Sequence, residues 1–162
     1  GTGSASINSA RYGDVGDTAI TLFLSCSNSD DSDNVKVVNG IYESLDAGDI
    51  DAFKAQLVPE VEWNEAENFL YDDGNPYIGA DAVLEGVMGR IGADWNDFIV
   101  DGRTTYGMHN NKVLVTGRYK ATHKTTGKKV NAQVAHLWSL KDGKIISFQQ
   151  YTDTKQFADA VK

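Results

Sequence analysis

The chain has a single cysteine, Cys26, among its 162 residues. An internal disulfide needs two cysteines and a structural zinc site usually needs a pair of thiolates, so the sequence leaves no basis for either. The chain also lacks any apolar run close to the eighteen or so residues that cross a bilayer, which argues against a membrane span. A chain of this length is predicted to be one domain that buries roughly 70% of its unfolded surface.

Positive charge is also scarce. Fifteen lysines and arginines stand against 23 acidic residues, which gives a formal net charge of -8. The basic residues are scattered, apart from residues 124–129, so the basic stripe of a nucleic-acid-binding protein is missing and no nucleic-acid partner is expected. The three histidines lack the spacing of metal ligands, and neither a glycine-rich phosphate loop nor a Ser-His-Asp arrangement is present. The sequence therefore predicts neither a metal nor a cofactor.

Residues 1–32 are rich in Gly, Ser and Asp and are predicted to be a leader or tether outside a folded domain of residues 33–162. One apolar run interrupts them, Ala19–Cys26, and it resembles the end of a bacterial lipoprotein signal. Phe23 stands where such signals usually have leucine, and the preceding residues are not basic. The bacterial cytoplasm is the first expectation for the location, and a periplasmic lipoprotein anchored through Cys26 is the alternative.

The most informative stretch is a C-terminal hairpin within residues 130–154. From Val130 to Leu140 every second residue is apolar except His136, which is the pattern of a strand with one buried face. The dipeptide Asp142-Gly143 follows, a strong signal for a hairpin turn, and residues 145–151 return as the partner strand. The sequence therefore places a histidine on the inner face of a long antiparallel hairpin.

The return strand also carries polar side chains toward the core. Depending on which of its two rows faces inward, the buried polar residues are Gln150, or Gln149 with Asp153. A buried polar group destabilises the fold unless it is paired. These side chains and His136 therefore either have local partners or face a cavity.

Helices are predicted before the strands. Apolar residues at steps of three and four predict a helix over residues 33–45 that stops at Gly48. A second, short helix is predicted to run through Leu57, with Asp49 able to cap its first turn and Pro59 following as the residue that ends it. A third helix is predicted over residues 79–91.

A long loop and a run of strands complete the chain. Residues 64–77 are polar and rich in turn formers, which indicates a loop. Strands at residues 98–106 and 112–123 form a meander of four antiparallel strands with the hairpin, and Thr154 is predicted to cap a last helical turn that ends at Val161. Helices followed by antiparallel strands define an α+β fold with the helices on one face of a curved sheet. Such a sheet, when it does not close, leaves a conical cavity where small-molecule sites are common.

Several short motifs have the order and spacing found in a known family. In chain order they are Gly48-Asp49, Val61-x-Trp63, Pro76-x-x-Gly79, Trp95-x-Asp97-Phe98, Gly117-x-Tyr119, Thr126-Gly127-Lys128, His136-x-Trp138, Asp142-Gly143-Lys144-Ile145 and Gln150-Tyr151-x-Asp153-Thr154. Over residues 33–162 the chain resembles the SnoaL-like polyketide cyclase branch of the nuclear transport factor 2-like superfamily, to which ketosteroid isomerase is related.

The resemblance implies an α+β cone, in which a strongly curved, mostly antiparallel sheet wraps around about three N-terminal helices. It also implies a homodimer formed through the sheet and a pocket for an apolar small molecule. In the cyclases an aspartate on the last strand serves as acid and base, and this chain has Gln150 there, which has no proton to exchange. The histidine that accompanies that aspartate matches His136. In ketosteroid isomerase a base aspartate works opposite a tyrosine and a protonated aspartate; their positions fall near Trp63, near Tyr42 and at His136.

Three residues are candidates for catalysis: His136 as the proton carrier, with Asp153 or Tyr42 in support. Each also has a structural interpretation, because a core histidine can be satisfied by its neighbours and Asp153 can cap the last helix. The residues predicted to bind a substrate are Trp63, Tyr119, Trp138 and Gln150.

Other carboxylates have weaker claims. Asp97 is expected to tie down the start of a strand, and Glu62, Glu65 and Glu67 are expected to be solvated, although a buried one would be a base of raised pKa. Two functions stay open: an acid/base isomerase or cyclase acting on an apolar carbonyl compound, or a non-catalytic domain that binds a small ligand or serves as a dimeric scaffold. Gln150 in place of the cyclase aspartate favours the second.

Overall fold

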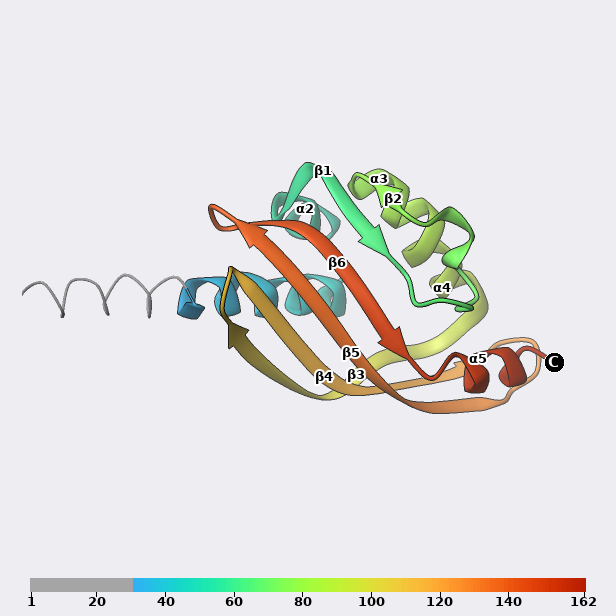
Figure 1. Cartoon of the computed structure of the whole chain (residues 1–162). Helices are drawn as coiled ribbons and strands as arrows, with labels where there is room; N and C mark the ends of the chain where they lie inside the picture. Colours follow the sequence, from blue (N-terminus) through green and yellow to red (C-terminus); the bar gives the residue numbers. More distant parts are fainter. Residues whose placement is uncertain (1–30) are drawn as a thin grey trace, which may run out of the picture.

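A computed structural model describes residues 31–162, and its arrangement is drawn in Figure 1. The lipoprotein-like run that ends at Cys26 lies outside the described residues. A helix covers residues 31–47, as the apolar spacing predicts. Gly48 follows it with a φ of 67°, the left-handed conformation that glycine adopts without strain at the end of a helix.

Helix α2 (Ile50–Ala55) is capped by the Asp49 side chain, which accepts a hydrogen bond from the backbone N–H of Ala52 at 3.0 Å. The helix ends at Ala55, two residues before the predicted end at Leu57, and Pro59 does not end it, because Leu57 and Pro59 both lie within strand β1 (Leu57–Asn64). Pro59 has no N–H to donate, and it stands in the part of β1 where the pairing with the neighbouring strand is irregular.

Six strands form one open sheet. In chain order they are β1, β2 (Tyr77–Ile78), β3 (Trp95–Met108), β4 (Lys112–His123), β5 (Lys129–Lys141) and β6 (Lys144–Thr152). Across the sheet the order is β2-β1-β6-β5-β4-β3, and every neighbouring pair is antiparallel except β1 with β6. The predicted four-strand meander is confirmed as β3 to β6. The sheet is mixed because β1 joins it beside the last strand.

Tight turns join the long strands. Asp142 and Gly143 have positive φ angles of 51° and 75°, as the predicted two-residue hairpin turn requires. Asn110 and Asn111 turn β3 into β4 with φ angles of 60° and 55°, and asparagine tolerates this conformation better than most residues. These local turns fix the register of β3 to β6 and thereby decide which side chains are neighbours on the inner face.

The predicted third helix is present but irregular. It consists of α3 (Ala80–Val83), a π-helical stretch η2 (Leu84–Met88) and α4 (Gly89–Asp94), which follow one another without a break. A short 3-10 turn, η1 (Asp72–Gly74), lies within the segment predicted as a loop. π-helical stretches are frequent at functional sites, and this one contributes to the cavity described below.

The last helix, α5 (Thr154–Ala160), is where the sequence predicts it; of the two caps that the sequence offers, Thr154 is wrong and Asp153 is confirmed. Asp153 is the cap, because its carboxylate accepts hydrogen bonds from the backbone N–H groups of Lys155 and Gln156. A carboxylate one residue before the helix reaches these unpaired N–H groups.

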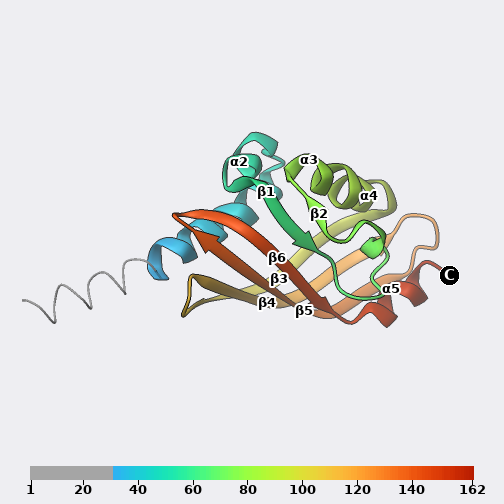
Figure 2. The ribbon, with the colours of Figure 1, turned by 45° about the horizontal axis from the view of Figure 1, so that its top comes forward.

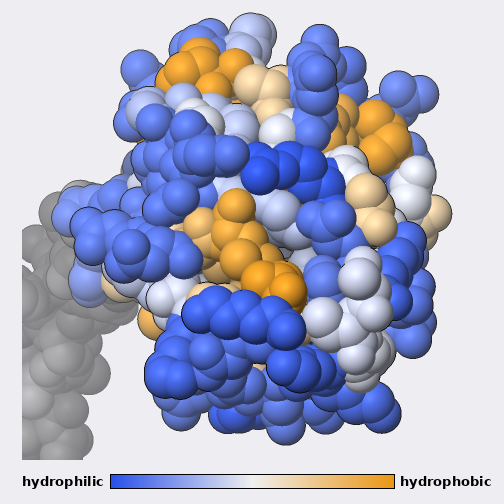
Figure 3. Space-filling model, turned by 90° about the vertical axis from the view of Figure 1, so that its right-hand side faces the viewer, coloured by the Kyte–Doolittle hydropathy of each residue, from blue (hydrophilic) through white to orange (hydrophobic). Residues whose placement is uncertain are grey.

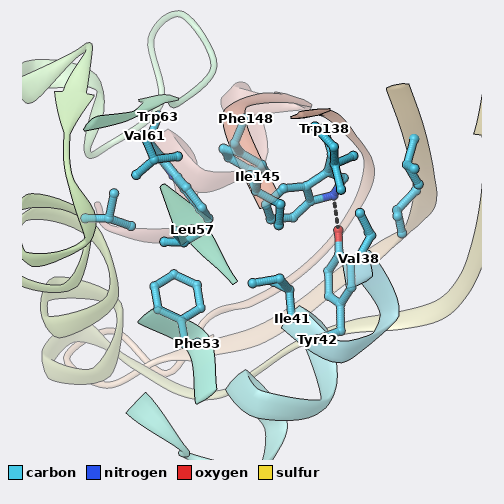
Figure 4. Packing of buried hydrophobic residues seen from close by; sticks show 14 of the residues in the cluster. Val38, Ile41, Tyr42, Phe53, Leu57, Val61, Trp63, Trp138, Ile145 and Phe148 are labelled. Carbon is cyan, nitrogen blue, oxygen red and sulfur yellow. Dashed lines mark hydrogen bonds between the residues drawn. The ribbon is translucent and has the colours of Figure 1, made fainter. Parts of the chain in front are cut away.

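The sheet curves around the helices, which lie on its concave side (Figure 1, Figure 2). The larger cluster of buried side chains fills the space between the 31–47 helix, α2, β1 and the hairpin of β5 and β6. Figure 4 shows Trp63, Phe148 and Trp138 side by side in this cluster, with the Trp138 nitrogen directed at the Tyr42 hydroxyl. A second cluster surrounds Phe157 of α5 at the opposite end of the sheet.

Hydrophilic residues cover most of the face shown in Figure 3, where a short band of hydrophobic side chains crosses the centre. Within residues 31–162, no helix has the length and apolar character that a membrane span requires.

Candidate functional site

A cavity of about 610 Å³ lies between the helices and the inner face of the sheet. Residues of the 31–47 helix, β1, η2, α4 and strands β3 to β6 line it, and most of this lining is apolar or aromatic. The buried polar side chains that border it are Tyr42, Glu65, Tyr119, His136 and Gln150. Apolar walls with a few convergent polar groups are typical of small-molecule sites.

His136 lies in the middle of β5, on the inner row that the alternation predicts. Its Nδ1 is 2.6 Å from the hydroxyl oxygen of Tyr42, which comes from the 31–47 helix, and its Nε2 is 2.6 Å from the hydroxyl oxygen of Tyr119 in β4. The three side chains form one chain of hydrogen bonds, which we name the Tyr–His–Tyr chain. Both ring nitrogens are thus occupied.

Two further groups hold the hydroxyls at the ends of the Tyr–His–Tyr chain. The Trp138 Nε1–H donates to the Tyr42 oxygen at 3.1 Å, the bond drawn in Figure 4, and the Gln150 amide nitrogen donates to the Tyr119 oxygen at 2.8 Å. The Gln150 carbonyl oxygen accepts a hydrogen bond from the backbone N–H of Ala66 at 3.0 Å. This contact fixes the orientation of the amide, because only its oxygen can accept from an N–H.

Burial lowers the pKa of His136 to about 3, because the imidazolium would be poorly solvated there and its hydrogen-bond partners are neutral hydroxyls. Burial also raises the pKa values of Tyr42 and Tyr119 far above the usual value for tyrosine. The Tyr–His–Tyr chain is therefore uncharged at neutral pH. Its histidine is suited to hold hydrogen bonds, since a proton carrier works best with a pKa near the working pH.

Glu65 is the second polar feature of the cavity, and it follows β1 directly. Its side chain is 3% exposed, and its Oε2 accepts a hydrogen bond from the Trp63 Nε1–H at 3.2 Å. Its Oε1 is buried without a hydrogen-bond partner, the one such side-chain atom in residues 31–162. Burial raises the pKa of Glu65 to about 8, and the bond from Trp63 offsets only part of this effect. The carboxyl group can therefore exchange its proton close to neutral pH.

Asn75 holds the backbone of Glu65 in place. The Asn75 side-chain oxygen accepts from the Glu65 N–H at 2.9 Å, and its side-chain nitrogen donates to the Glu65 carbonyl oxygen at 2.8 Å. Both backbone groups of Glu65 need such partners because β1 ends at Asn64. The Asn75 amide thus makes the two backbone hydrogen bonds that a neighbouring strand would otherwise make, at the residue whose carboxyl group lies beside the cavity.

Arg103 brings a positive charge to the Tyr42 end of the cavity. Its guanidinium carbon lies 4.9 Å from the centre of the Tyr42 ring, and the group pairs with Asp46 at 3.0 Å. A bulge of β3 after Asp101 leads the chain to this position. Gly117 of β4 makes room for the bulge, because a Cβ there would lie 2.8 Å from the Asp101 carbonyl oxygen.

The structure brings together most of the residues that the sequence singles out. The cavity lining includes the predicted binding residues Trp63, Tyr119, Trp138 and Gln150 and the predicted catalytic residues His136 and Tyr42. The inward row of β6 is the one that holds Gln150, which is 2% exposed. Asp153 stands apart: it is exposed, caps α5 and is not among the lining residues.

Glu65 is the functional candidate that the sequence does not separate from its neighbours. In the structure Glu62 and Glu67 are exposed, whereas Glu65 is buried. A signal for this difference exists in the sequence, because Val61, Trp63 and Glu65 occupy every second position and the first two are apolar. This signal is missed because the loop is predicted to begin at residue 64, so the alternation is not followed as far as Glu65.

The site combines apolar walls, hydrogen-bonding groups on one wall and a titratable carboxyl group on another. No cluster of three or more His, Cys, Asp and Glu side chains suited to a metal ion occurs in residues 31–162. The fold and the site together define an α+β cone with a cavity of small-molecule size. The model of the SnoaL-like domain matches residues 38–148, and the chain belongs to this family, as its motifs indicate.

Solved structures support the assignment. An NTF2-like protein from Burkholderia thailandensis E264 is 33% identical, with 80% of this chain and 97% of that chain covered and a TM-score of 0.71. A candidate polyketide cyclase from Xanthomonas campestris pv. campestris is 17% identical, with 82% and 99% covered and a TM-score of 0.71. TerC, crystallised with polyporic acid, is 20% identical, with 80% and 98% covered and a TM-score of 0.70. The last two show likeness of fold alone. No curated protein matches the chain.

Proposed function

We propose that this protein is an acid/base enzyme that moves a proton within an apolar carbonyl compound, with Glu65 as the proton carrier. The observation that carries the proposal is the buried Glu65 carboxyl group beside the cavity, one oxygen of which has no hydrogen-bond partner among the described residues. A buried polar atom without a partner destabilises the fold. A reacting group in the cavity supplies the partner that this oxygen lacks.

The reaction is a proton transfer next to a carbonyl group. The Glu65 carboxylate takes a proton from the carbon beside the carbonyl, the C–H electron pair forms a C=C bond, and the carbonyl π electrons move onto the oxygen. Return of the proton to another carbon completes an isomerisation. For a cyclisation the enolate carbon attacks a second carbonyl, whose π electrons move onto its oxygen, and this alkoxide takes the proton back from Glu65. The pKa of Glu65, about 8, suits both directions of transfer near neutral pH.

The remaining lining fits an apolar substrate. Trp63 and Trp138 meet edge to face with ring centres 5.5 Å apart, and Phe148 lies against both. Such a wall contacts planar rings and excludes water, which strengthens hydrogen bonds made inside the cavity. These contacts support an apolar, ring-containing ketone with a C–H group beside its carbonyl as the substrate.

A non-catalytic ligand-binding domain is the second candidate. Gln150 stands where the cyclases have their acid/base aspartate, and its amide is held by hydrogen bonds with Ala66 and Tyr119. His136, the other position that the resemblance assigns to chemistry, has no free nitrogen. Both observations favour a site that holds its ligand without changing it, and the test below separates the two candidates.

Binding is measured first, by quenching of tryptophan fluorescence with a panel of planar ketones and quinones that includes polyporic acid. Exchange of the hydrogens next to the carbonyl with deuterium from the solvent is then followed by NMR for each compound that binds and has a C–H group on the carbon beside its carbonyl. We expect the Glu65→Gln variant to bind the same compounds and to lose roughly 10²- to 10⁴-fold in exchange rate, because its amide carries no exchangeable acid proton.

The matched control is Glu62→Gln, which makes the same change at an exposed position of β1. Exchange at the native rate in Glu65→Gln would remove Glu65 as the carrier. Saturable binding without any exchange in the native protein would establish the second candidate.

We further propose that the protein forms a homodimer through the outer face of the sheet, as the resemblance implies. On that face Leu137 of β5 lies opposite Leu114 of β4, and both are half-buried without a partner chain. Ala135 and the exposed Tyr151 of β6 are paired beside them. We expect Leu137→Glu to convert a dimer to a monomer in analytical ultracentrifugation; a monomeric native protein would exclude the proposal.

A further inference from the structure

The Tyr–His–Tyr chain contains one proton more than its own hydrogen bonds use. Two hydrogen bonds join its three side chains, and each uses one proton. The neutral imidazole supplies one N–H and the two tyrosines supply one O–H each, which makes three. Trp138 and Gln150 do not accept the third proton, because both donate to the hydroxyls. One hydroxyl proton is therefore left without an acceptor in residues 31–162.

The tautomer of His136 decides which hydroxyl holds the spare proton. When the ring proton is on Nε2, it is donated to Tyr119, Tyr42 donates to Nδ1, and the Tyr119 proton is spare. When the ring proton is on Nδ1, the roles are exchanged and the Tyr42 proton is spare. In either case the hydroxyl with the spare proton already accepts two hydrogen bonds, so it can act only as a donor.

Charges at the two ends of the Tyr–His–Tyr chain distinguish the tautomers. The Arg103 guanidinium lies over the Tyr42 ring, and a positive charge there disfavours a free proton at that end. Glu65 lies near the other end, because the Gln150 amide links the N–H of the following residue to the Tyr119 hydroxyl. Glu65 brings no positive charge to this end, whether its carboxyl group is protonated, as it mainly is at pH 7, or ionised. The positive charge of Arg103 at the Tyr42 end therefore favours the tautomer with its proton on Nε2.

We propose that the Tyr119 hydroxyl is the ligand-binding donor of the cavity and that it takes an oxygen with a free lone pair, such as that of a ketone, a quinone or an enolate. This deepens the proposed function and rests on it for the presence of a ligand, whereas the orientation of the Tyr–His–Tyr chain requires no ligand. The resemblance to ketosteroid isomerase points instead to Tyr42 as the tyrosine of the site. His136 is then a positioning residue, which aligns Tyr119 through a neutral hydrogen bond.

The first test is the ¹⁵N NMR spectrum of the ligand-free native protein at pH 7. His136→Phe assigns the His136 signals among those of the three histidines. We expect one protonated nitrogen, Nε2, and one unprotonated nitrogen, Nδ1. A proton on Nδ1, or protons on both nitrogens, would overturn the proposed orientation.

The second test compares the affinities for 9-fluorenone and fluorene, two ring systems that differ in the carbonyl group. We expect the native protein to bind fluorenone about tenfold more tightly, the value of one good hydrogen bond. In Tyr119→Phe this preference falls to near one, and it is retained in the matched variant Tyr106→Phe, which changes an exposed tyrosine of β3 that is not a lining residue. The ratio is taken within each variant, so a change that weakens both ligands equally cancels.

The outcomes are distinct. Tyr119→Phe leaves the N–H groups of Gln150 and His136 without an acceptor, so near-ultraviolet circular dichroism checks that each variant is folded. Survival of the carbonyl preference in Tyr119→Phe, or its absence in the native protein, would refute the role of Tyr119. If Glu65 proves not to exchange protons, the proposed function fails while the tautomer and the carbonyl preference stand.

Discussion

Among the buried groups that border the cavity, His136 and Glu65 differ in how completely they are hydrogen-bonded. His136 is 6% exposed and Glu65 is 3% exposed, so water reaches neither group freely. Both nitrogens of His136 have tyrosine hydroxyls as partners, whereas Glu65 leaves its Oε1 unpaired. A fully paired polar group contributes to the fold and holds its neighbours in position. An unpaired one destabilises the protein until a ligand or a proton arrives, which is the condition expected of a reactive group.

Burial moves the pKa values of the two groups in opposite directions with the same result. It raises the pKa of Glu65 to about 8 and lowers the pKa of His136 to about 3, because it disfavours the charged form of each. Both groups are therefore mainly neutral at pH 7, but only Glu65 titrates near that pH. The chemistry of the cavity is thus expected at the Glu65 end and its binding geometry at the His136 end.

The largest expected effect is on the pH dependence of stability at the Glu65 end. The folded pKa of Glu65 lies above its ordinary value of 4.5, so its contribution to stability is fully present below pH 4.5 and is lost as the pH rises through about 8. Glu65→Gln removes this loss. The difference in unfolding free energy between this variant and the native protein should therefore grow, in favour of the variant, by up to about 1.4 kcal/mol for each pH unit between pH 4.5 and about 8. Urea unfolding at several pH values between 5 and 9 measures the difference, and a constant difference would contradict the raised pKa.

The His136 end should instead respond to loss of packing and hydrogen bonds. His136→Phe keeps a ring in the core but takes one partner from each of two buried hydroxyls, which should lower the unfolding free energy by about 2–4 kcal/mol. Glu65→Gln at pH 5 should cost less than about 1 kcal/mol, because the glutamate is already protonated there and the amide has its shape. Urea unfolding of both variants at pH 5 makes the comparison. Equal losses would show that the two ends do not differ as we infer.

A smaller effect is expected from the residue that positions Glu65. Asn75→Ala removes both side-chain hydrogen bonds to the Glu65 backbone. The carboxyl group should then become better solvated, its pKa should fall from about 8 toward 4.5, and proton exchange should slow about tenfold. The pH profile of exchange reports the first change separately from the second. A slower rate with an unmoved midpoint would leave Asn75 with a purely structural role.

The smallest effect is expected at Asp153, a carboxylate outside the cavity. Its side chain caps α5, so Asp153→Ala should cost about 1 kcal/mol of stability, the usual value of a lost helix cap. Ligand binding and proton exchange should not change, because Asp153 is exposed and is not a lining residue. Thermal unfolding and the exchange assay measure the two quantities. Loss of exchange in this variant would return Asp153 to the candidates for catalysis.

Much of the fold and half of the site follow from the sequence. Alternation along β5 puts His136 and Trp138 on the inner face, and Asp142-Gly143 turns the chain into β6 at the predicted place. These are local properties, since the period of two and the turn preferences of asparagine, aspartate and glycine act over a few residues. These local properties are sufficient to predict the α+β class and the four-strand meander, and they also underlie the family motifs.

Local patterns were misleading where several residues compete for one role. The Asp153 carboxylate, not the Thr154 hydroxyl, reaches the free N–H groups of α5, and Pro59 stands inside β1 instead of ending α2. A rule based on residue type cannot choose between adjacent caps. Nor can it foresee a parallel pairing of β1 with β6, which depends on segments at least 85 residues apart.

The tertiary structure alone decided which polar groups are paired. His136 meets Tyr42 and Tyr119 over separations of 94 and 17 residues, and Gln150 meets the N–H of Ala66 over 84. Nothing in the neighbourhood of Glu65 in the sequence shows that it lacks such a partner. The sequence determined which side chains face inward, because strand period and turns are local. The fold decided which of them is left unpaired, because hydrogen-bond partners and burial come from segments distant along the chain.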